Sequence, residues 1–298
     1  MIKMRWSTRK RLEFIESRLF WDGKISRKDL TDFFDVSVPQ ATKDLKMYSE
    51  LAPENIRYDN RAKHYEAGKN FKPEFSSLDS ETYFSHLAVS NTEKNDVFFC
   101  GTIPESYQMP LLARPVRPAI LKSILECMHN GYSIEIEYQS MNSPDPTRRW
   151  VSPHAISTDG LRWHVRALCH NDKKYKDFVI GRIISTGDKK KFPYSHENDF
   201  LWHNNITFRI APHHDLSVNQ RKIIECDYNM TDGEVSIQIK AALHFYLKHR
   251  LGLNKNNEDY PGKEHHIILL NRDEVQTKIS LLEEIEKSKI SEIFQKSR

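Results

Sequence analysis

The stretch SRKDLTDFFDVSVPQATKDLKMY, residues 26–48, contains the start signals of two short helices. Ser26 is followed three residues later by Asp29, which is the spacing of a capping box at the start of a helix. The helix that follows places Leu30, Phe33 and Phe34 on its buried side. A tight turn at residues 35–36 and a second helix complete the pattern of a helix-turn-helix.

The second helix of this pair begins at Ser37, and Gln40 stands at the reciprocal capping position. Apolar spacing of three, four and three residues predicts that the inward positions are Val38, Ala41, Leu45 and Tyr48. The outward positions are then Gln40, Thr42, Lys43, Lys46 and Met47. Amide, hydroxyl and ammonium groups near the start of a helix can exchange hydrogen bonds with base edges in the major groove of DNA. We therefore interpret this helix as a DNA-reading helix. The alternative to a DNA contact is that Gln40 only caps its own helix.

Two further elements frame this pair of helices. A first helix is predicted over residues 8–21, with an apolar stripe made of Leu12, Ile15, Leu19 and Phe20. Two short strands at 56–58 and 64–66 enclose a turn whose tip carries Arg61 and Lys63, which is the form of a wing with a phosphate-binding tip. Residues 1–68 hold 14 Lys and Arg against 11 Asp and Glu, a net charge of only +3, so the placement of the cations matters more than their number.

The predicted DNA contacts come from the helix starts, the outward face of the reading helix and the wing tip. They are Arg9, Arg27, Lys28, Ser37, Gln40, Thr42, Lys43, Lys46, Arg61 and Lys63. The apolar spacing alone would equally suit a three-helix module that binds proteins. The wing and the cationic outer face favour DNA.

The rest of the chain predicts an α+β fold in further segments. A proline-punctuated connector covers residues 69–118 and contains one short helix at 80–89. A small β-barrel is expected over residues 119–195, from a helix at 119–129 and strands at 132–138, 150–157, 161–169 and 178–184. The last segment, residues 196–298, mixes strands at 206–210 and 234–241 with helices at 217–226, 244–251 and 281–295.

The strand at 161–169 carries potential cations on one face. Strand alternation puts Arg162, His164 and Arg166 on one side and the apolar residues on the other, and Arg148, Arg149, His154 and Arg182 could join them. Because like charges on one face repel, something anionic must answer them. Arginine forks match phosphate oxygens, which favours a phosphate-bearing ligand. The alternative is a solvated face whose cations pair with Glu135 and Glu137.

A family resemblance supports the ligand interpretation. The stretches YQS (138–140), RWVSPH (149–154), DGLRWHVRA (159–167) and DFVIGRI (177–183) resemble a WYL domain. The whole layout resembles the BrxR/CapW group of WYL regulators, which repress bacterial phage-defence operons. The resemblance covers nearly the full chain and is strongest over residues 119–184. One departure is that the name-giving Trp-Tyr-Leu triplet is Trp163-His164-Val165 here.

The resemblance implies a winged helix-turn-helix at residues 1–68, an Sm/SH3-like WYL ligand-sensing barrel at 119–195 and a C-terminal α/β dimerisation domain at 196–298. It also implies a ligand-binding set that consists of Tyr138, Ser140, His154, His164, Arg166 and Arg182, with Arg149 and Trp163 added. Trp163 lies on the apolar side by alternation, which also suits a core position.

Several other functions find no support in the sequence. Cys100, Cys127, Cys169 and Cys226 are scattered without a CxxC pair, so we expect reduced, buried thiols and no zinc site. The run PHHD at 212–215 reads as a surface loop, since adjacent side chains point apart in an extended chain. No GxGxxG, P-loop or GxSxG motif occurs, so we expect no enzyme, no metal and no cofactor. No apolar run approaches the ~20 residues of a membrane span, and we expect a cytoplasmic protein.

The sequence thus predicts a homodimeric repressor that binds an inverted-repeat operator and is controlled by a nucleotide or nucleic-acid ligand in the barrel. The main alternative is a nucleotide or oligonucleotide sensor whose N-terminal domain contacts proteins. A third possibility, a nuclease, would require metal-dependent cleavage.

Overall fold

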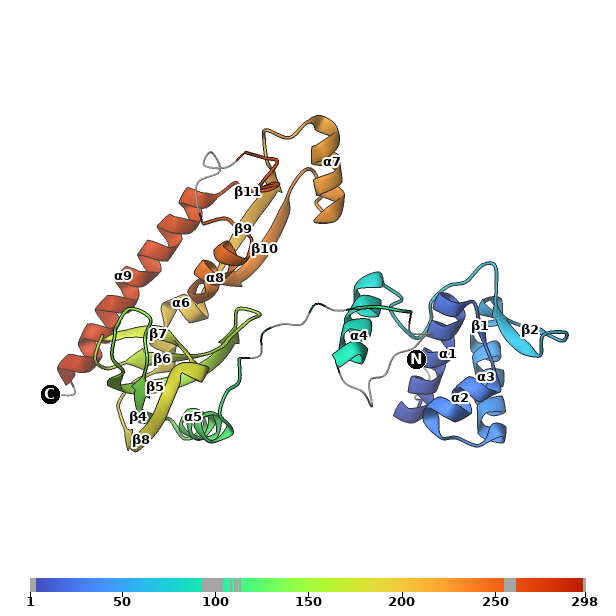
Figure 1. The fold of residues 1–298 in the computed structure, drawn as a ribbon, viewed down its shortest axis with the longest axis horizontal. Helices are drawn as coiled ribbons and strands as arrows, with labels where there is room; N and C mark the ends of the chain where they lie inside the picture. Colours follow the sequence, from blue (N-terminus) through green and yellow to red (C-terminus); the bar gives the residue numbers. More distant parts are fainter. Residues whose placement is uncertain are drawn as a thin grey trace. The chain divides into compact units, whose positions relative to one another are not determined.

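The chain forms two compact units, residues 1–110 and residues 111–298. The computed structural model describes residues 4–92, 104–107, 109, 112, 114–254 and 261–296, and Figure 1 shows their ribbon. Each unit has hydrophobic cores of its own. The predicted segment boundaries after residues 68, 118 and 195 stay predictions.

The first unit is a three-helix core with a small sheet. Its elements are α1 (Trp6–Asp22), β1 (Lys24–Ile25), α2 (Arg27–Phe34), α3 (Val38–Leu51), η1 (Pro53–Asn55), β2 (Ile56–Asp59), β3 (His64–Ala67) and α4 (Ser80–Thr92). The strands pair in the order β1-β3-β2, and the β2–β3 hairpin projects away from the helices (Figure 1). The predicted helix-turn-helix and wing are therefore present, and β1 is a strand that the sequence did not indicate.

The core of this unit is narrower than predicted. Leu12, Ile15, Leu19, Leu30, Ala41, Leu45 and Tyr48 are fully buried, as expected. In contrast, Phe20, Phe33 and Val38 are 43%, 40% and 58% exposed. Val38 is the first residue of α3, at the end of the helix. The predicted inward position of Val38 was wrong.

A buried carboxylate fixes the segment that follows the wing. Glu16 of α1 is fully buried and accepts backbone N–H groups of Glu74, Phe75 and Ser76 at 2.8–2.9 Å. It also accepts the hydroxyl of Tyr48, which comes from α3. Hydrogen bonds to a buried charged group are stronger than neutral ones, so the start of the connector is held against the three-helix core.

The second unit begins with a twisted five-stranded antiparallel sheet and a helix. The elements are α5 (Pro118–Asn130), β4 (Tyr132–Tyr138), β5 (Thr147–Thr158), β6 (Trp163–Cys169), β7 (Lys174–Val179), η2 (Ile180–Arg182) and β8 (Ile183–Lys191), in the strand order β7-β6-β5-β4-β8. The edge strands β7 and β8 do not pair in the described residues, so the sheet is not a closed barrel. The predicted strand at 178–184 was wrong as a unit, because η2 divides it between β7 and β8.

In its described residues, the C-terminal part adds a three-stranded sheet, four α-helices and two short 3-10 helices. They are η3 (His196–Asn198), α6 (Phe200–His203), β9 (Asn205–Pro212), α7 (Val218–Asp227), β10 (Val235–Lys240), η4 (Ala241–Leu243), α8 (His244–Arg250), β11 (Ile267–Leu269) and α9 (Arg272–Lys296), with the sheet order β10-β9-β11. Helix α9 has 25 residues and begins well before the predicted residue 281. It packs Ile279 and Leu282 on the C-terminal sheet and Ile290 against Leu168 of β6, so it joins both sheets (Figure 1).

None of the helices in the described residues is long and apolar enough to cross a membrane. Cys127 and Cys169 are buried free thiols as predicted, whereas Cys226 is exposed. Cys100 lies outside the described residues.

Candidate functional site

The first candidate surface is the helix-turn-helix of α2 and α3. Ser26 and Asp29 form the predicted capping box at the start of α2. Asp35 adopts a left-handed conformation (φ 50°) that ends α2 and turns the chain. Ser37 then caps α3 by accepting the N–H of Gln40. Local signals in residues 26–40 therefore set the geometry of the pair.

A polar contact inside the unit orients α3 on α1. Asp44 is 1% exposed, and its carboxylate accepts hydrogen bonds from Arg11 at 2.6 Å and from the side-chain amide of Gln40 at 2.9 Å. Gln40 is therefore not a reciprocal cap, because its side chain points along α3 toward Asp44 instead. The sequence analysis missed Asp44, although its spacing of three residues from Ala41 placed it beside the buried stripe.

The outward face of α3 is open to solvent. Thr42, Lys43 and Lys46 are exposed, on the side away from the buried Ala41, Leu45 and Tyr48. Thr42 donates its hydroxyl hydrogen to the carbonyl of Val38 at 2.9 Å, which leaves its oxygen lone pairs as acceptors. Lys46 lies 3.8 Å from Glu50, an exposed and weak pair. This face combines cations and acceptors that a DNA groove requires.

The wing tip is an ordered turn. The carboxylate of Asp59 accepts the N–H groups of Arg61 and Ala62 at 2.7 and 3.0 Å, and these bonds lower the pKa of Asp59. Lys63 has a left-handed backbone (φ 57°), which completes the turn. Both predicted cations of the wing, Arg61 and Lys63, are exposed at this tip.

Most of the predicted DNA contacts are accessible. Of the ten residues, Gln40 alone is only partly exposed, and the exposed ones are Arg9, Arg27, Lys28, Ser37, Thr42, Lys43, Lys46, Arg61 and Lys63. Arg9 forms an ion pair with Glu13 at 3.0 Å along α1, so the carboxylate already balances part of the charge of Arg9. The contacts of these residues with DNA remain predictions.

The second candidate surface is the cationic face of β6, and it is buried. His164 and Arg166 are 3% and 4% exposed. Arg166 donates from Nε and Nη2 to the two oxygens of Asp199 at 2.8 and 2.9 Å, and from Nη1 to Asp177 at 3.4 Å. The expectation that a solvated face would pair with Glu135 and Glu137 was wrong. The answering acids come from β7 and from the residue before α6.

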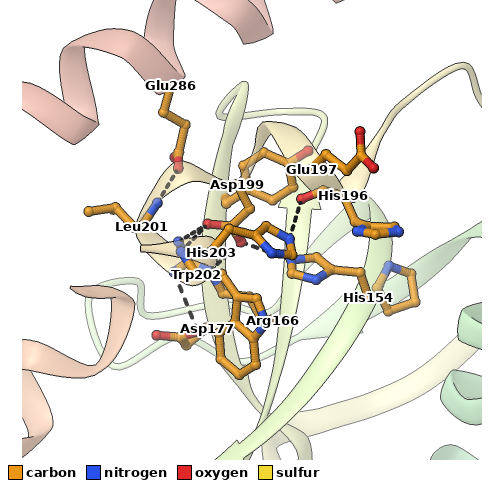
Figure 2. A network of polar contacts seen from close by, with 12 residues as sticks. His154, Arg166, Asp177, His196, Glu197, Asp199, Leu201, Trp202, His203 and Glu286 are labelled. Atoms are coloured by element: carbon orange, nitrogen blue, oxygen red, sulfur yellow. Dashed lines mark hydrogen bonds and ion pairs between the residues drawn. The ribbon is translucent and has the colours of Figure 1, made fainter. Parts of the chain in front are cut away.

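Asp199 is the centre of this network, as Figure 2 shows. It is fully buried, accepts from His154 Nε2 at 2.8 Å, and caps α6 by accepting the N–H of Trp202 at 3.0 Å. Burial alone would raise the pKa of Asp199, but the hydrogen bonds and charges of His154 and Arg166 lower it to about 2. This residue is therefore a buried carboxylate that binds Arg166 and His154 at once.

A second buried acid, Glu286, lies beside Asp199. Glu286 of α9 is 5% exposed, and burial together with the charge of Asp199 raises its pKa to about 8. Burial also raises the pKa of Asp177, against the opposing effect of Arg166. Three acidic groups thus surround one arginine, and α9 contributes one of them.

His164 lies at the other end of this face. Its ring is tilted against that of Tyr246 with centroids 4.9 Å apart, and Tyr246 donates its hydroxyl to Asp177 at 3.3 Å. Burial lowers the pKa of His164. The charges of Arg162 and Arg182 act in the same direction. Helix α8, through Tyr246, therefore covers the end of the face that α6 leaves open.

The structure brings together only part of the predicted ligand set, namely His154, His164 and Arg166, while Arg182 lies in η2 with a partly exposed side chain. Tyr138 points into the core on the opposite side of the sheet, where its hydroxyl accepts the N–H of Val179 at 3.3 Å. Arg149 pairs with Asp172 at 2.7 Å, and Ser140 accepts an N–H of its own loop. Trp163 is 54% exposed and is not a core residue.

The sequence analysis missed the residues that cover this face. They are Asp177, Asp199, Tyr246 and Glu286. Asp199 did carry a local signal, because it directly precedes a short apolar helix and Asp is a common N-cap. Its partner Arg166 is 33 residues away in the sequence, and no local pattern indicates that pairing.

A histidine-rich turn follows β9. The ligand atoms of His213, His214 and Asp215 lie within 4.8 Å of one another, and the two rings stack with centroids 4.4 Å apart. His213 is 1% exposed, and its Nδ1 accepts the N–H of Asp215 at 3.1 Å. His214 and Asp215 are exposed in a turn, as expected of a surface loop, whereas His213 is buried. The expectation that the side chains point apart was wrong, because the chain turns after β9. The absence of a metal site stays a prediction.

Three family models match the chain in order. They are the BrxR transcriptional regulator winged helix-turn-helix domain at residues 7–89, the WYL domain at 119–186 and the BrxR transcriptional regulator C-terminal dimerization domain at 205–275. The matches confirm the predicted order of a winged helix, a WYL domain and a dimerisation domain.

Full-length relatives agree with the domain matches. The chain is 38% identical over 274 residues to the DNA-binding transcriptional repressor CapW of Pseudomonas aeruginosa, which spans 91% of this chain and 92% of that protein. It is 35% identical to CapW of Escherichia coli (strain KTE188), over 91% of both chains. A solved structure, proteasome accessory factor B/C (PafBC) of Arthrobacter aurescens, is similar at 13% identity and a TM-score of 0.26 over 95% of this chain and 48% of that one, which is too distant to carry an argument.

These relatives are regulators, in agreement with the prediction that the chain is not an enzyme. With more than a third of its residues shared over nine-tenths of its length, the chain belongs to the family of the CapW DNA-binding transcriptional repressors.

Proposed function

We propose that this protein represses transcription by binding operator DNA as a homodimer, with α3 in the major groove and the wing on the phosphates. The observation that carries the proposal is the outward face of α3, where Thr42, Lys43 and Lys46 are exposed while the opposite side locks into the core. A DNA-reading helix must have this division between a fixed side and an accessible side.

The dimer places two reading helices on two half-sites. One winged helix makes few base contacts, and a symmetric dimer doubles them on an inverted repeat. The match of residues 205–275 to a dimerization domain supports this assembly. Phe245 of α8 is 60% exposed and is available for such a contact, whereas its neighbour Tyr246 is turned inward to Asp177.

The WYL sheet is the ligand-sensing part of this repressor, and an anionic, phosphate-bearing ligand binds it at Arg166. His154 shares Asp199 with Arg166, and His164 lies on the same face of β6, which supports an anion site. A ligand controls DNA binding only if it has different affinities for the DNA-binding and the released states. Here the C-terminal part covers the site, so a bound ligand and the covered arrangement are alternatives.

Footprinting on the DNA upstream of the protein's own gene tests the repressor function. We expect protection of two inverted half-sites whose centres are separated by about 10 base pairs or a multiple of that spacing, at a stoichiometry of one dimer per site. Light scattering of the free protein at the same concentration should give the mass of a dimer. Protection of one half-site by a monomer, or binding that is indifferent to sequence, contradicts the proposal.

A further inference from the structure

The contact between Arg166 and Asp199 has the geometry of an anion site that is already filled. Both carboxylate oxygens of Asp199 face the fork of the guanidinium, at 2.8 and 2.9 Å. A phosphate group presents two oxygens to an arginine fork in the same way. His154 and Nε of Arg166 share one oxygen of Asp199, to which His154 donates at 2.8 Å (Figure 2). An anion that replaced Asp199 would therefore find two donors in place, Arg166 and His154.

Next to this pair, the face carries two buried polar atoms without partners among the described residues. They are Nδ1 of His164 and Oγ of Ser157. Ser157 and His164 are directly paired across β5 and β6, so their side chains lie on the same face of the sheet. Ala155 pairs with Arg166 on that same face, two residues beyond His164 along β6. Buried polar groups in folded proteins almost always have partners.

The covered arrangement therefore leaves hydrogen-bonding capacity unused beside a filled anion site. Ser157 can donate or accept, and Nδ1 of His164 can do either according to its tautomer. The other nitrogen of His164, Nε2, lies 4.0 Å from Asp159. A ligand that placed polar groups over Ser157 and His164 would satisfy both atoms, which Asp199 does not reach.

Release of Asp199 would loosen the elements that cover the face. Asp199 caps α6 through the N–H of Trp202, and Leu201 of the same short helix donates its N–H to Glu286 of α9 at 3.5 Å. The departure of Asp199 removes the N-cap of α6. The exchange keeps the charge of Arg166 balanced, because an incoming anion replaces an outgoing carboxylate, and a buried cation is never left bare.

We propose that the face formed by Ser157, His164 and Arg166 binds a phosphate-bearing ligand in exchange for Asp199, which is the built-in competitor of that ligand. Ser157 is then a ligand contact that the structural pairing reveals. This inference rests on the sensing role given above and adds how the site is kept closed. The exchange couples ligand binding to the release of α6.

Calorimetry with three phosphate probes tests the exchange on the full-length protein. The probes are inorganic phosphate, adenosine 5′-monophosphate and a 5′-phosphorylated tetrathymidylate, which separate a free anion, a nucleotide and an oligonucleotide. Asp199→Asn keeps an N-cap for α6 but removes the competing charge, so we expect it to bind the best probe at least about tenfold more tightly than the wild type. Asp188→Asn, on exposed β8 of the same sheet, is the matched control and should bind like the wild type.

Hydrogen–deuterium exchange measures the release of α6. In the wild type, a saturating probe should speed exchange at the amides of Trp202 and His203, which Asp199 holds at the start of α6 in the covered state. A probe that binds the wild type while these amides stay protected overturns the exchange but leaves the sensing role intact. A failure of every probe to bind either protein overturns the sensing role itself.

Ser157→Ala gives an independent readout that does not depend on Asp199. The hydroxyl makes no hydrogen bond in the covered state, so its removal should leave the thermal midpoint unchanged or slightly higher. We expect its affinity for the best probe to fall about fivefold or more, since a donor to the ligand is lost. If Ser157→Ala binds the best probe as tightly as the wild type, Ser157 is not a ligand contact.

Discussion

The outer face of α3 and the inner face of β6 carry the same kind of residues in opposite surroundings. On α3, Lys43 and Lys46 are exposed and stay in water. On β6, Arg166 is 4% exposed and held by Asp199 and Asp177. Cations along one side of an element thus do not indicate by themselves whether that side is open or covered. The cover on β6 comes from elements much later in the sequence.

The largest expected difference between the two faces is in stability. Arg166→Met leaves Asp199 and Asp177 buried without their cation, and we expect the free energy of unfolding of residues 111–298 to fall by about 3 kcal/mol. Lys43→Ala, on the exposed face, should change the free energy of unfolding of the first unit by less than about 0.5 kcal/mol. Denaturant titration of both full-length variants measures this contrast. Equal, small effects would mean that the β6 network contributes nothing to the fold.

The pH dependence of stability should also belong to the β6 face. The pKa of Glu286 is raised to about 8 in the folded protein, against about 4.3 for an unperturbed Glu. Between these values the unfolded chain loses its proton while the folded chain keeps it, so stability falls as the pH rises from about 4.5 to 8. Glu286→Gln should remove about 2 kcal/mol of that fall.

Unfolding midpoints of this variant and the wild type across pH 5–8 measure the effect. Glu284→Gln, an exposed neighbour on α9, is the control and should follow the wild type. A steeper pH dependence in Glu286→Gln than in the wild type contradicts the assignment.

The first unit has a smaller buried polar network, and it sharpens the comparison. The hydroxyl of Tyr48 donates to Glu16 at 3.2 Å and accepts from Asn55 at 3.2 Å. Tyr48→Phe removes both bonds, and we expect it to destabilise this unit by about 1.5 kcal/mol without changing the exposed face of α3. Thermal unfolding and operator affinity at low temperature separate the two effects. A loss of affinity in fully folded protein would show that Tyr48 also sets the position of α3.

The smallest effect is expected at the wing. Arg61→Ala removes one cation at the tip, and the slope of log affinity against log salt should become shallower by about one. The loss should be similar for operator and unrelated DNA, since phosphates carry no sequence. A loss confined to the operator would place Arg61 on a base instead.

Local signals explain which parts of the fold were predictable. The capping box at Ser26, the turn at Asp35 and the cap at Ser37 act within four residues, so both helices of the reading pair begin where the sequence indicated. The burial of Ala41, Leu45 and Tyr48 and the exposure of Thr42, Lys43 and Lys46 follow from the period of α3. The predictions for Val38 and Met47 were wrong, because Val38 at the helix end is exposed and Met47 packs against the core.

The β6 face was predicted only in part because its environment is not local. Alternation correctly put His164 and Arg166 on one face, but Asp199 and Glu286 lie 33 and 120 residues beyond Arg166 in the sequence. The break of the strand 178–184 at η2 likewise depends on the turn from one sheet edge to the other. Trp163 looked like core by alternation and is exposed, because it begins β6 at the rim of the sheet.

The salt dependence of operator binding by Lys43→Ala tests the central claim most directly, with Lys174→Ala on the exposed start of β7 as the matched control. Anisotropy titrations with labelled operator across a range of salt concentrations should give Lys43→Ala weaker binding and a slope shallower by about one, while Lys174→Ala keeps the wild-type slope and affinity. The same slope and affinity in Lys43→Ala as in the wild type would contradict the assignment of α3 as the DNA-reading helix.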